Sequence, residues 1–300
     1  MWKRFFANKG AFAGLILIVL LSLFSLAAPG LSPYEYDEVD VAHQHQPPRI
    51  PVLENFGIFD GTIDGIDYYG DCRDVYHYFG TDTLGRDLWT RVFLGTRVSL
   101  YIAILSVLIE MTIGIIYGVT AGYYGGGVDI VMQRILEIIQ GIPTIVLVTL
   151  LMMVLKPGLT TITIALVMAG WINMSLLVRS QVLKLKEMEY VLSARTLGQS
   201  DISIIFGEIL PNAAGQIVIM AMMSIPQAIF LEAYLSFMGL GIPDPMASLG
   251  SLINTGFSSM LLYPYMVLIP VIVFIILVVS FNLVADGLRD ALDNTMETIG

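Results

Sequence analysis

Few residues in the apolar parts of this chain could do chemistry, and Glu110 is the most suggestive of them. It is the one ionisable residue that clearly lies inside an apolar, membrane-spanning stretch. A charged side chain at that depth is costly, so it usually marks a substrate or ion path, or else faces a wet cavity or a polar neighbouring helix. Both interpretations of Glu110 stay open. Asn173 and Gln227 could line the same kind of path, although helix packing explains them equally well.

Other catalytic and metal chemistry finds little support. His43 and His45 form an H-x-H pair near several acids, but the chain has only 3 histidines and no fixed scaffold surrounds this pair, so we expect no metal site. No span contains a histidine that could act as the base of an intramembrane protease. A G-x-x-x-x-G-K-[ST] phosphate loop is absent, since the glycines at 125–127 lack the lysine. We therefore expect neither an enzyme nor a cofactor bound by this chain.

The composition places these residues in a membrane protein. Hydrophobic residues make up 56% of the chain, charged residues make up 13%, and the mean hydropathy is +0.78. A helix needs about 20 apolar residues to cross a bilayer. The runs that satisfy this length predict an all-α protein with six transmembrane helices, over residues 11–28, 98–128, 138–155, 159–178, 213–231 and 261–285.

Basic residues predict how these spans are oriented. Lys3, Arg4 and Lys9 precede the first span, which puts the N-terminus in the cytoplasm. Six crossings then place the C-terminus and the loop with Arg179 and Arg195 on the same side. A cleaved signal peptide at the N-terminus is the alternative, but 18 apolar residues exceed a usual signal core.

The net charge of -10 is concentrated in the outer segment between the first two spans, where residues 34–91 hold 12 acids and 4 arginines. Its Pro, Gly, Asp and Tyr content predicts an irregular or partly β excursion. This sign of charge disfavours nucleic acid as a partner. In the second span, Gly114, Gly118 and Gly122 recur at four-residue spacing and predict close packing against another helix.

A polar segment of residues 189–211, between the fourth and fifth spans, is long for a loop of a membrane protein. It predicts a short helix that ends at Gly198 and a second helix capped by Ser200. We expect Pro211 to end the second helix, which carries one apolar stripe formed by Ile202, Ile205, Phe206 and Ile209. A helix lying on the membrane is the alternative, but two short helices broken at a glycine favour a knob that enters a partner's groove.

This segment resembles the EAA loop of bacterial ABC importer permeases. Residues 192–194 occupy the E-A-A positions, Gly198 the glycine, and Leu210 and Pro211 the closing pair, while Leu192 and Glu208 depart from the pattern. A second block, GTDTLGRD at residues 80–87, is similar to the block that marks the C-type permease subunit of the peptide and nickel importer family. Further matches lie at residues 121–126, at Asp129 and at 235–241, so the resemblance covers nearly the whole chain.

The resemblance implies the fold of a type I ABC importer permease and a set of partners. These would be a homologous B-type permease, two cytoplasmic ATPases that use ATP and Mg, an extracytoplasmic peptide-binding protein and membrane lipid. The ATPases would dock on the EAA-like loop, with the candidate residues Glu189, Tyr190, Ser193, Ala194, Arg195, Gly198, Ser200, Ile205, Leu210 and Pro211.

The expected organisation has four parts. These are an N-terminal transmembrane helix at 1–30, an outer segment at 31–95, a five-helix core at 96–290 with the loop at 186–212, and a cytoplasmic tail at 291–300. The implied function is oligopeptide import across a bacterial plasma membrane. A dipeptide, nickel or other small-solute importer is the alternative within the family, and a non-transporting receptor or scaffold is the alternative outside it.

Overall fold

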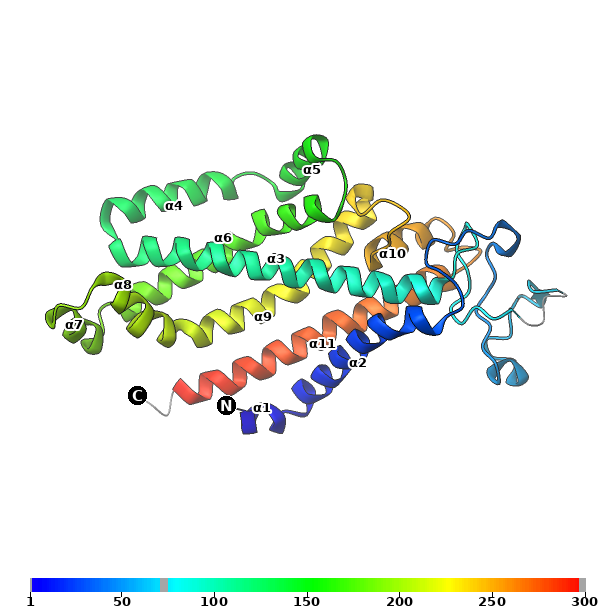
Figure 1. Ribbon diagram of the computed structural model, residues 1–300, viewed down its shortest axis with the longest axis horizontal. Helices are drawn as coiled ribbons and strands as arrows, with labels where there is room; N and C mark the ends of the chain where they lie inside the picture. The colour runs from blue at the N-terminus through cyan, green and yellow to red at the C-terminus, as the bar shows by residue number, and fades with distance from the viewer. Residues whose placement is uncertain (1, 71–74, 297–300) are drawn as a thin grey trace.

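The computed structural model describes residues 2–70 and 75–296 of the chain. Long helices run side by side along the longest axis of the molecule (Figure 1). Within these described residues, five helical segments are long and apolar enough to cross a membrane, which confirms an all-α membrane architecture. They are α2 (Lys9–Leu31), α3 (Leu88–Tyr124), α6 (Leu159–Leu185), the continuous helix Asp201–Leu240 and α11 (Tyr265–Met296).

The two ends of the bundle differ in content. Both termini lie at one end together with the short helices α7 (Glu189–Thr196) and α8 (Asp201–Ile204), whereas the segment between α2 and α3 lies at the opposite end (Figure 1). Helix α1 (Trp2–Ala7) precedes α2. Helix α11 continues to Met296, into the segment expected as a tail, and residues 297–300 of that tail lie outside the described part.

The apolar run at residues 138–155 does not form the single straight span that we expected. It is shared between α4 (Gly126–Gln140) and α5 (Thr144–Leu155), which meet at an angle of 80°. Pro143 explains the break, because it lacks a backbone N–H and disfavours helical geometry at the preceding residue. A sixth crossing results only if this bent pair counts as one span.

The helix predicted to stop at Pro211 also runs on. Residues 201–240 form one helix whose parts are α8, the π turn η3 (Ile205–Ile209), α9 (Leu210–Leu235) and the π turn η4 (Ser236–Leu240). In the first π turn the Leu210 N–H donates to the Ile205 carbonyl, so the backbone is already widened where Pro211 enters. The Asn212 side chain donates to the Glu208 carbonyl at 2.6 Å. The expectation that Pro211 ends the helix was therefore wrong.

The segment before α3 is irregular with a minimal β component, as predicted. Among its described residues, the regular elements are the 3-10 turns η1 (Val41–His43) and η2 (Leu53–Phe56) and a hairpin of β1 (Thr62–Ile63) and β2 (Ile66–Asp67). Helix α3 begins at Leu88, ten residues before the expected start of the second span and ahead of the boundary placed after residue 95. Asp87 caps it by accepting from the Thr90 N–H at 2.9 Å.

Helices α3 and α6 form the central pair of the bundle, and α9, α11 and the short α10 (Leu249–Phe257) pack around them. The glycine face of α3 makes this contact possible. A Cβ on Gly114, Gly118 or Gly122 would fall within 3 Å of atoms of α6. The predicted packing role of these glycines is therefore confirmed.

We expect Gly118→Ala to destabilise the protein by about 1–3 kcal/mol, the range for overpacking. The added Cβ would lie 2.5 Å from the Ser175 carbonyl oxygen, and backbone atoms cannot move aside cheaply. Thermal unfolding of the detergent-solubilised protein measures the effect. Gly30→Ala in α2 is the matched control, because a Cβ there meets nothing within 4 Å. Equal stability of the two variants would contradict tight α3–α6 packing.

Candidate functional site

The polar segment forms a helical hairpin in which α7 and α8 are joined at Gly198. Gly198 has φ +78°, a conformation that favours glycine, and its N–H donates to the Arg195 carbonyl at 3.0 Å. Ser200 caps α8 by accepting from the Ser203 N–H at 3.3 Å. The structure thus confirms both predicted features of this turn.

Burial divides the ten candidate docking residues into two groups. Ala194 and Ile205 are buried within this chain and Leu210 is half-buried, so they can hold the hairpin but present little surface. The remaining candidates are exposed, and they are Glu189, Tyr190, Ser193, Arg195, Gly198, Ser200 and Pro211.

The predicted single apolar stripe on the second helix is wrong. Ile205 and Ile209 are buried together with Ile204, whereas Ile202 and Phe206 are exposed. The expected stripe assumed an unbroken 3.6-residue period, and the π turn at residues 205–209 changes that period.

An apolar surface remains exposed on the hairpin. It consists of Leu192, Leu197, Ile202 and Phe206, and we call it the hairpin surface. Leu197, next to the turn, is 82% exposed. A shallow hollow along α7 lies beside it, lined by Glu189, Leu192, Ser193, Thr196 and Leu197. These exposed apolar groups make the hairpin a candidate docking surface for a protein partner.

Tyr123, near the end of α3, fastens the hairpin to the bundle. Its hydroxyl donates to Asp201 Oδ1 at 2.7 Å, and its ring lies under the Arg195 guanidinium at 5.5 Å. The Lys186 ammonium also donates to the Gly122 carbonyl at 2.8 Å. Tyr123 therefore contacts both arms of the hairpin, a role that the sequence analysis missed because it depends on the folding of a distant segment.

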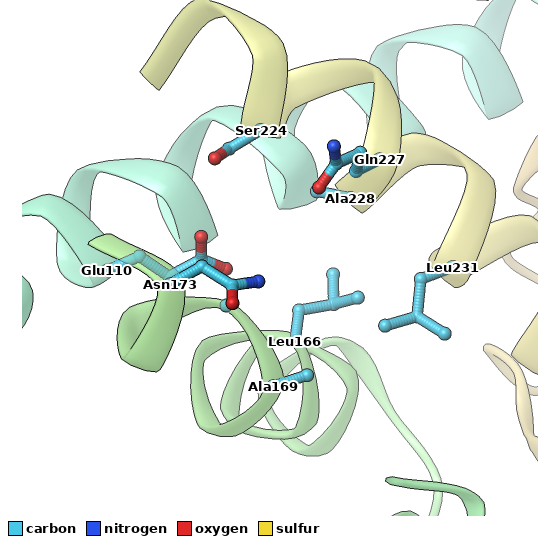
Figure 2. A pocket seen from close by; sticks show the side chains of 9 residues that line it. Glu110, Leu166, Ala169, Asn173, Ser224, Gln227, Ala228 and Leu231 are labelled. Carbon is cyan, nitrogen blue, oxygen red and sulfur yellow. The ribbon is translucent and has the colours of Figure 1, made fainter. Parts of the chain in front are cut away.

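Between α3, α6 and α9, the structure brings together the three candidate substrate-path residues, of which Asn173 and Gln227 are exposed. Glu110 of α3, Asn173 of α6 and Gln227 of α9 line one cavity of about 190 Å³ (Figure 2). Glu110 is only 4% exposed. A Cβ on Gly170 would fall 2.1 Å from the Glu110 carboxyl carbon, so the absence of a side chain at Gly170 makes room for this carboxyl group.

A second acid, Glu232 in α9, lies deep in the bundle, so Glu110 is not the only ionisable residue inside a span. Glu232 is fully buried and accepts hydrogen bonds from the hydroxyls of Ser99 and Ser236, both at 2.8 Å. The expected span ended at residue 231, one position too early to include it. Because its oxygens are satisfied within the chain, this carboxyl group ties α3 to α9 and η4.

The two histidines considered as a metal pair are engaged separately. His43 Nδ1 lies 2.5 Å from Asp40 Oδ2, and the His45 ring stacks on Tyr263 at 4.2 Å. Burial lowers the pKa of His45, which the nearby Asp82 partly opposes. Within residues 2–70 and 75–296, no group of three or more His, Cys, Asp or Glu side chains could hold a metal ion.

The GTDTLGRD block builds a buried charge cluster at the start of α3. Asp82 accepts from Arg86 Nε at 2.7 Å and from the backbone N–H groups of Leu84 and Arg86. Asp244, in the loop before α10, pairs with Arg86 at 2.9 Å and with Arg91 at 3.2 Å. The block therefore joins the segment between α2 and α3 to the loop that follows η4.

Comparison with known proteins assigns the chain to a family. Residues 114–298 match the family model of the binding-protein-dependent transport system inner membrane component. The chain belongs to this family. Residues 1–48 of this inner membrane component match a second model, described as the N-terminal transmembrane domain of oligopeptide transport permease C.

Curated relatives cover nearly all of this inner membrane component. The oligopeptide transport system permease protein OppC of Bacillus subtilis is 40% identical over 98% of this chain and 89% of its own length. The dipeptide transport system permease protein DppC of the same organism is 38% identical over 97% of this chain and 84% of its own. These relatives are membrane permease components of ABC transporters and not ATPases.

A solved structure supports the fold of this inner membrane component. A chain of the inward-facing MetNI methionine ABC transporter aligns with a TM-score of 0.57 at 18% identity, covering 67% of this chain and 96% of that one. The fold is therefore that of a type I ABC importer permease, as the sequence resemblance implied.

We expect Tyr123→Ala to weaken the hold of α3 on the hairpin, because it removes the Arg195 contact and the Asp201 hydrogen bond together. Tyr123→Phe removes only the hydrogen bond, a contribution of about 1.5–3 kcal/mol when the acceptor is charged. Amide hydrogen exchange of residues 189–204 should therefore rise most in the Ala variant and less in the Phe variant. Tyr101→Ala, at an exposed position on the same helix, is the control. Unchanged exchange in Tyr123→Ala would contradict the fastening role.

Proposed function

We propose that this chain is the permease subunit of an ATP-driven importer of oligopeptides. The observation that carries the proposal is the exposed hairpin surface on a family member that has no ATP-binding motif of its own. Such a subunit needs an energy source on another chain, and an exposed apolar surface on a pair of short helices is suited to bind that chain. The peptide substrate is inferred from the names of the OppC and DppC relatives.

The partners follow from this role. A homologous B-type permease would form the other half of the path, and two cytoplasmic ATPases would use ATP and Mg and dock on the hairpins of the two permeases. An extracytoplasmic binding protein would deliver the peptide at the opposite end. This chain would itself hold no cofactor and hydrolyse no ATP.

The orientation that this role requires places the hairpin and both termini in the cytoplasm of a bacterial cell. Two observations support it: the termini and the hairpin share one end of the molecule (Figure 1), and basic residues cluster in the first turns of the chain and around the hairpin. The outer segment of residues 31–95 would then face the binding protein.

The proposal is tested by reconstituting the complete complex in proteoliposomes and measuring ATP hydrolysis. Binding protein loaded with peptide should stimulate hydrolysis and drive uptake, and an uncoupled complex would contradict the transport function. A non-transporting receptor or scaffold would show no such coupling between peptide-loaded binding protein and ATP hydrolysis.

Dipeptide import is the second candidate, because the DppC relative is almost as similar as OppC. Competition of labelled oligopeptide uptake by dipeptides, longer peptides and Ni²⁺ separates the substrates. We expect longer peptides to compete best. Competition by Ni²⁺ alone would favour the nickel alternative.

A further inference from the structure

The open cavity between α3, α6 and α9 combines three polar side chains that have no partner in the described part of the chain. Glu110, Asn173 and Gln227 enter it from three different helices (Figure 2), and none of the three side chains makes a hydrogen bond or an ion pair with a described residue. Ser224, in the same lining, already donates to the Met220 carbonyl. Glu110 is 4% exposed, whereas Asn173 and Gln227 are exposed beside it at the opening of the cavity. A carboxyl group without a partner inside a membrane span is costly, so this arrangement indicates a ligand.

The chemistry of these groups selects the ligand. A carboxylate and two side-chain amides offer four acceptor oxygens, enough for the three N–H donors of an alkylammonium group, whose positive charge the carboxylate balances. Hydrogen bonds between such charged groups are the stronger ones. A divalent metal ion fits less well, because Glu110 is the one ionisable group in the lining and Mg²⁺ or Ca²⁺ takes about six to eight oxygen ligands.

We propose that Glu110, Asn173 and Gln227 form a binding site for an ammonium group of the transported peptide. The group is either the peptide's amino terminus or the side-chain amine of a basic residue. This inference rests on the proposed function and adds to it the part of the substrate that the permease itself recognises.

The size of the cavity limits what enters it. Its volume of about 190 Å³ is below the roughly 300–1,000 Å³ of pockets that enclose a whole small ligand. An ammonium group and the carbons next to it fit, whereas the rest of a peptide lies outside the cavity. The site would therefore bind one ammonium group of the peptide and make no contact with most of its other residues.

Gly170 offers a second substitution that perturbs the Glu110 carboxyl group. A methyl group there would occupy the place of the Glu110 carboxyl group, which lies 2.1–2.2 Å from the added Cβ. Gly170→Ala therefore moves the carboxyl group but keeps its charge. Glu110→Gln keeps its size but removes the charge.

The first test measures uptake by the complete complex in proteoliposomes with one saturating binding protein. Three tetrapeptides are compared: one with a free amino terminus and no lysine, its N-acetylated form, and an acetylated form with one lysine. We expect Glu110→Gln to slow uptake of the free-amine peptide by about ten- to a hundredfold, the loss of one hydrogen bond to a charged group. Uptake of the acetylated peptide without lysine should be unchanged.

Each peptide's uptake is compared between the wild-type complex and the variants. The same binding protein is used in every case, so its own preference among the three peptides cancels. Gly170→Ala should lower the same uptake, and Thr112→Val, at an exposed position on the same helix, should not. An effect on the acetylated lysine peptide assigns the site to side-chain amines as well, and no effect restricts it to the amino terminus. An equal loss for all three peptides, or no loss for any of them, overturns the ammonium site.

The second test does not depend on transport. In a Cys72→Ser background, Ala169→Cys places a thiol in the cavity lining. We expect a cationic methanethiosulfonate reagent to modify it about tenfold faster than an anionic reagent of similar size, the ratio that 1.4 kcal/mol of preference gives. Glu110→Gln should abolish this preference, and the free-amine peptide should protect the thiol.

An unchanged ratio in Glu110→Gln overturns the site. If the ratio behaves as expected but the wild-type complex takes up no peptide, the proposed function fails and the cation preference of the cavity stands.

Discussion

Gly198→Asp is expected to abolish ATP-driven uptake while the chain still inserts into the membrane. An L-residue at φ +78° costs about 1–2 kcal/mol, which is too little to unfold a membrane bundle. A Cβ at this position meets nothing within 4 Å, so the new side chain disturbs no internal packing and alters only the exposed surface of the turn. There it places a negative charge beside Leu197, on the surface that we assign to the ATPase. Co-purification of the ATPases and peptide-stimulated ATP hydrolysis measure the loss.

The chain offers a matched control at Gly65. It has φ +79° and equally open surroundings, but lies in the β1–β2 turn at the other end of the molecule. Gly65→Asp therefore carries the same backbone strain without touching the hairpin, and we expect it to leave ATPase association intact. Normal transport by Gly198→Asp would refute the docking role. Equal failure of both variants would assign the effect to strain.

The features that could be predicted from the sequence depend on near neighbours along the chain. The turn at Gly198 and the cap at Ser200 are set by the φ angle of one residue and by hydrogen bonds within three positions. The glycine face of α3 follows from four-residue spacing alone. The spans follow from the length of the apolar runs, because the bilayer requires each crossing to be apolar.

The features that were missed depend on residues far apart in the sequence. Glu232 is paired with Ser99 across 133 positions, and Arg86 with Asp244 across 158. Such pairs form because particular helices pack together, and the periodicity of a single sequence does not show which helices are neighbours. The split of the expected stripe between buried Ile205 and exposed Phe206 has a different cause, since the π turn changes the helical period.

The hairpin and the cavity share the same two helices, which gives a physical basis for coupling them. Tyr123 and Glu110 both lie on α3, 13 residues apart, or about 20 Å at the helical rise. Helix α6 carries Asn173 at the cavity and leads into the hairpin through Lys186, whose ammonium donates to the Gly122 carbonyl of α3 at 2.8 Å. Because the α3–α6 contact is tight, we expect a displacement of the hairpin by a partner to move the cavity walls as well.

Asp82→Ala is expected to cause the largest loss of stability, about 3–5 kcal/mol, the range for breaking a buried ion pair. The substitution leaves the buried guanidinium of Arg86 without its 2.7 Å partner and removes the acceptor of two backbone N–H groups. Arg91, whose Nε lies 3.6 Å from the same carboxylate, is buried beside it, so two positive charges would share Asp244 alone. We expect the variant to accumulate poorly in membranes and to unfold at a lower temperature.

Asp244→Ala provides the graded comparison, because it removes the other carboxylate of the same cluster. The Asp244 side chain is 67% exposed, so water can replace it and the loss should be well below that of Asp82→Ala. Asp37→Ala, at an exposed position in the same segment between α2 and α3, should have no effect. The reverse order, with Asp244→Ala the more damaging, would show that the cluster is held by the loop before α10 and not by the turn that begins α3.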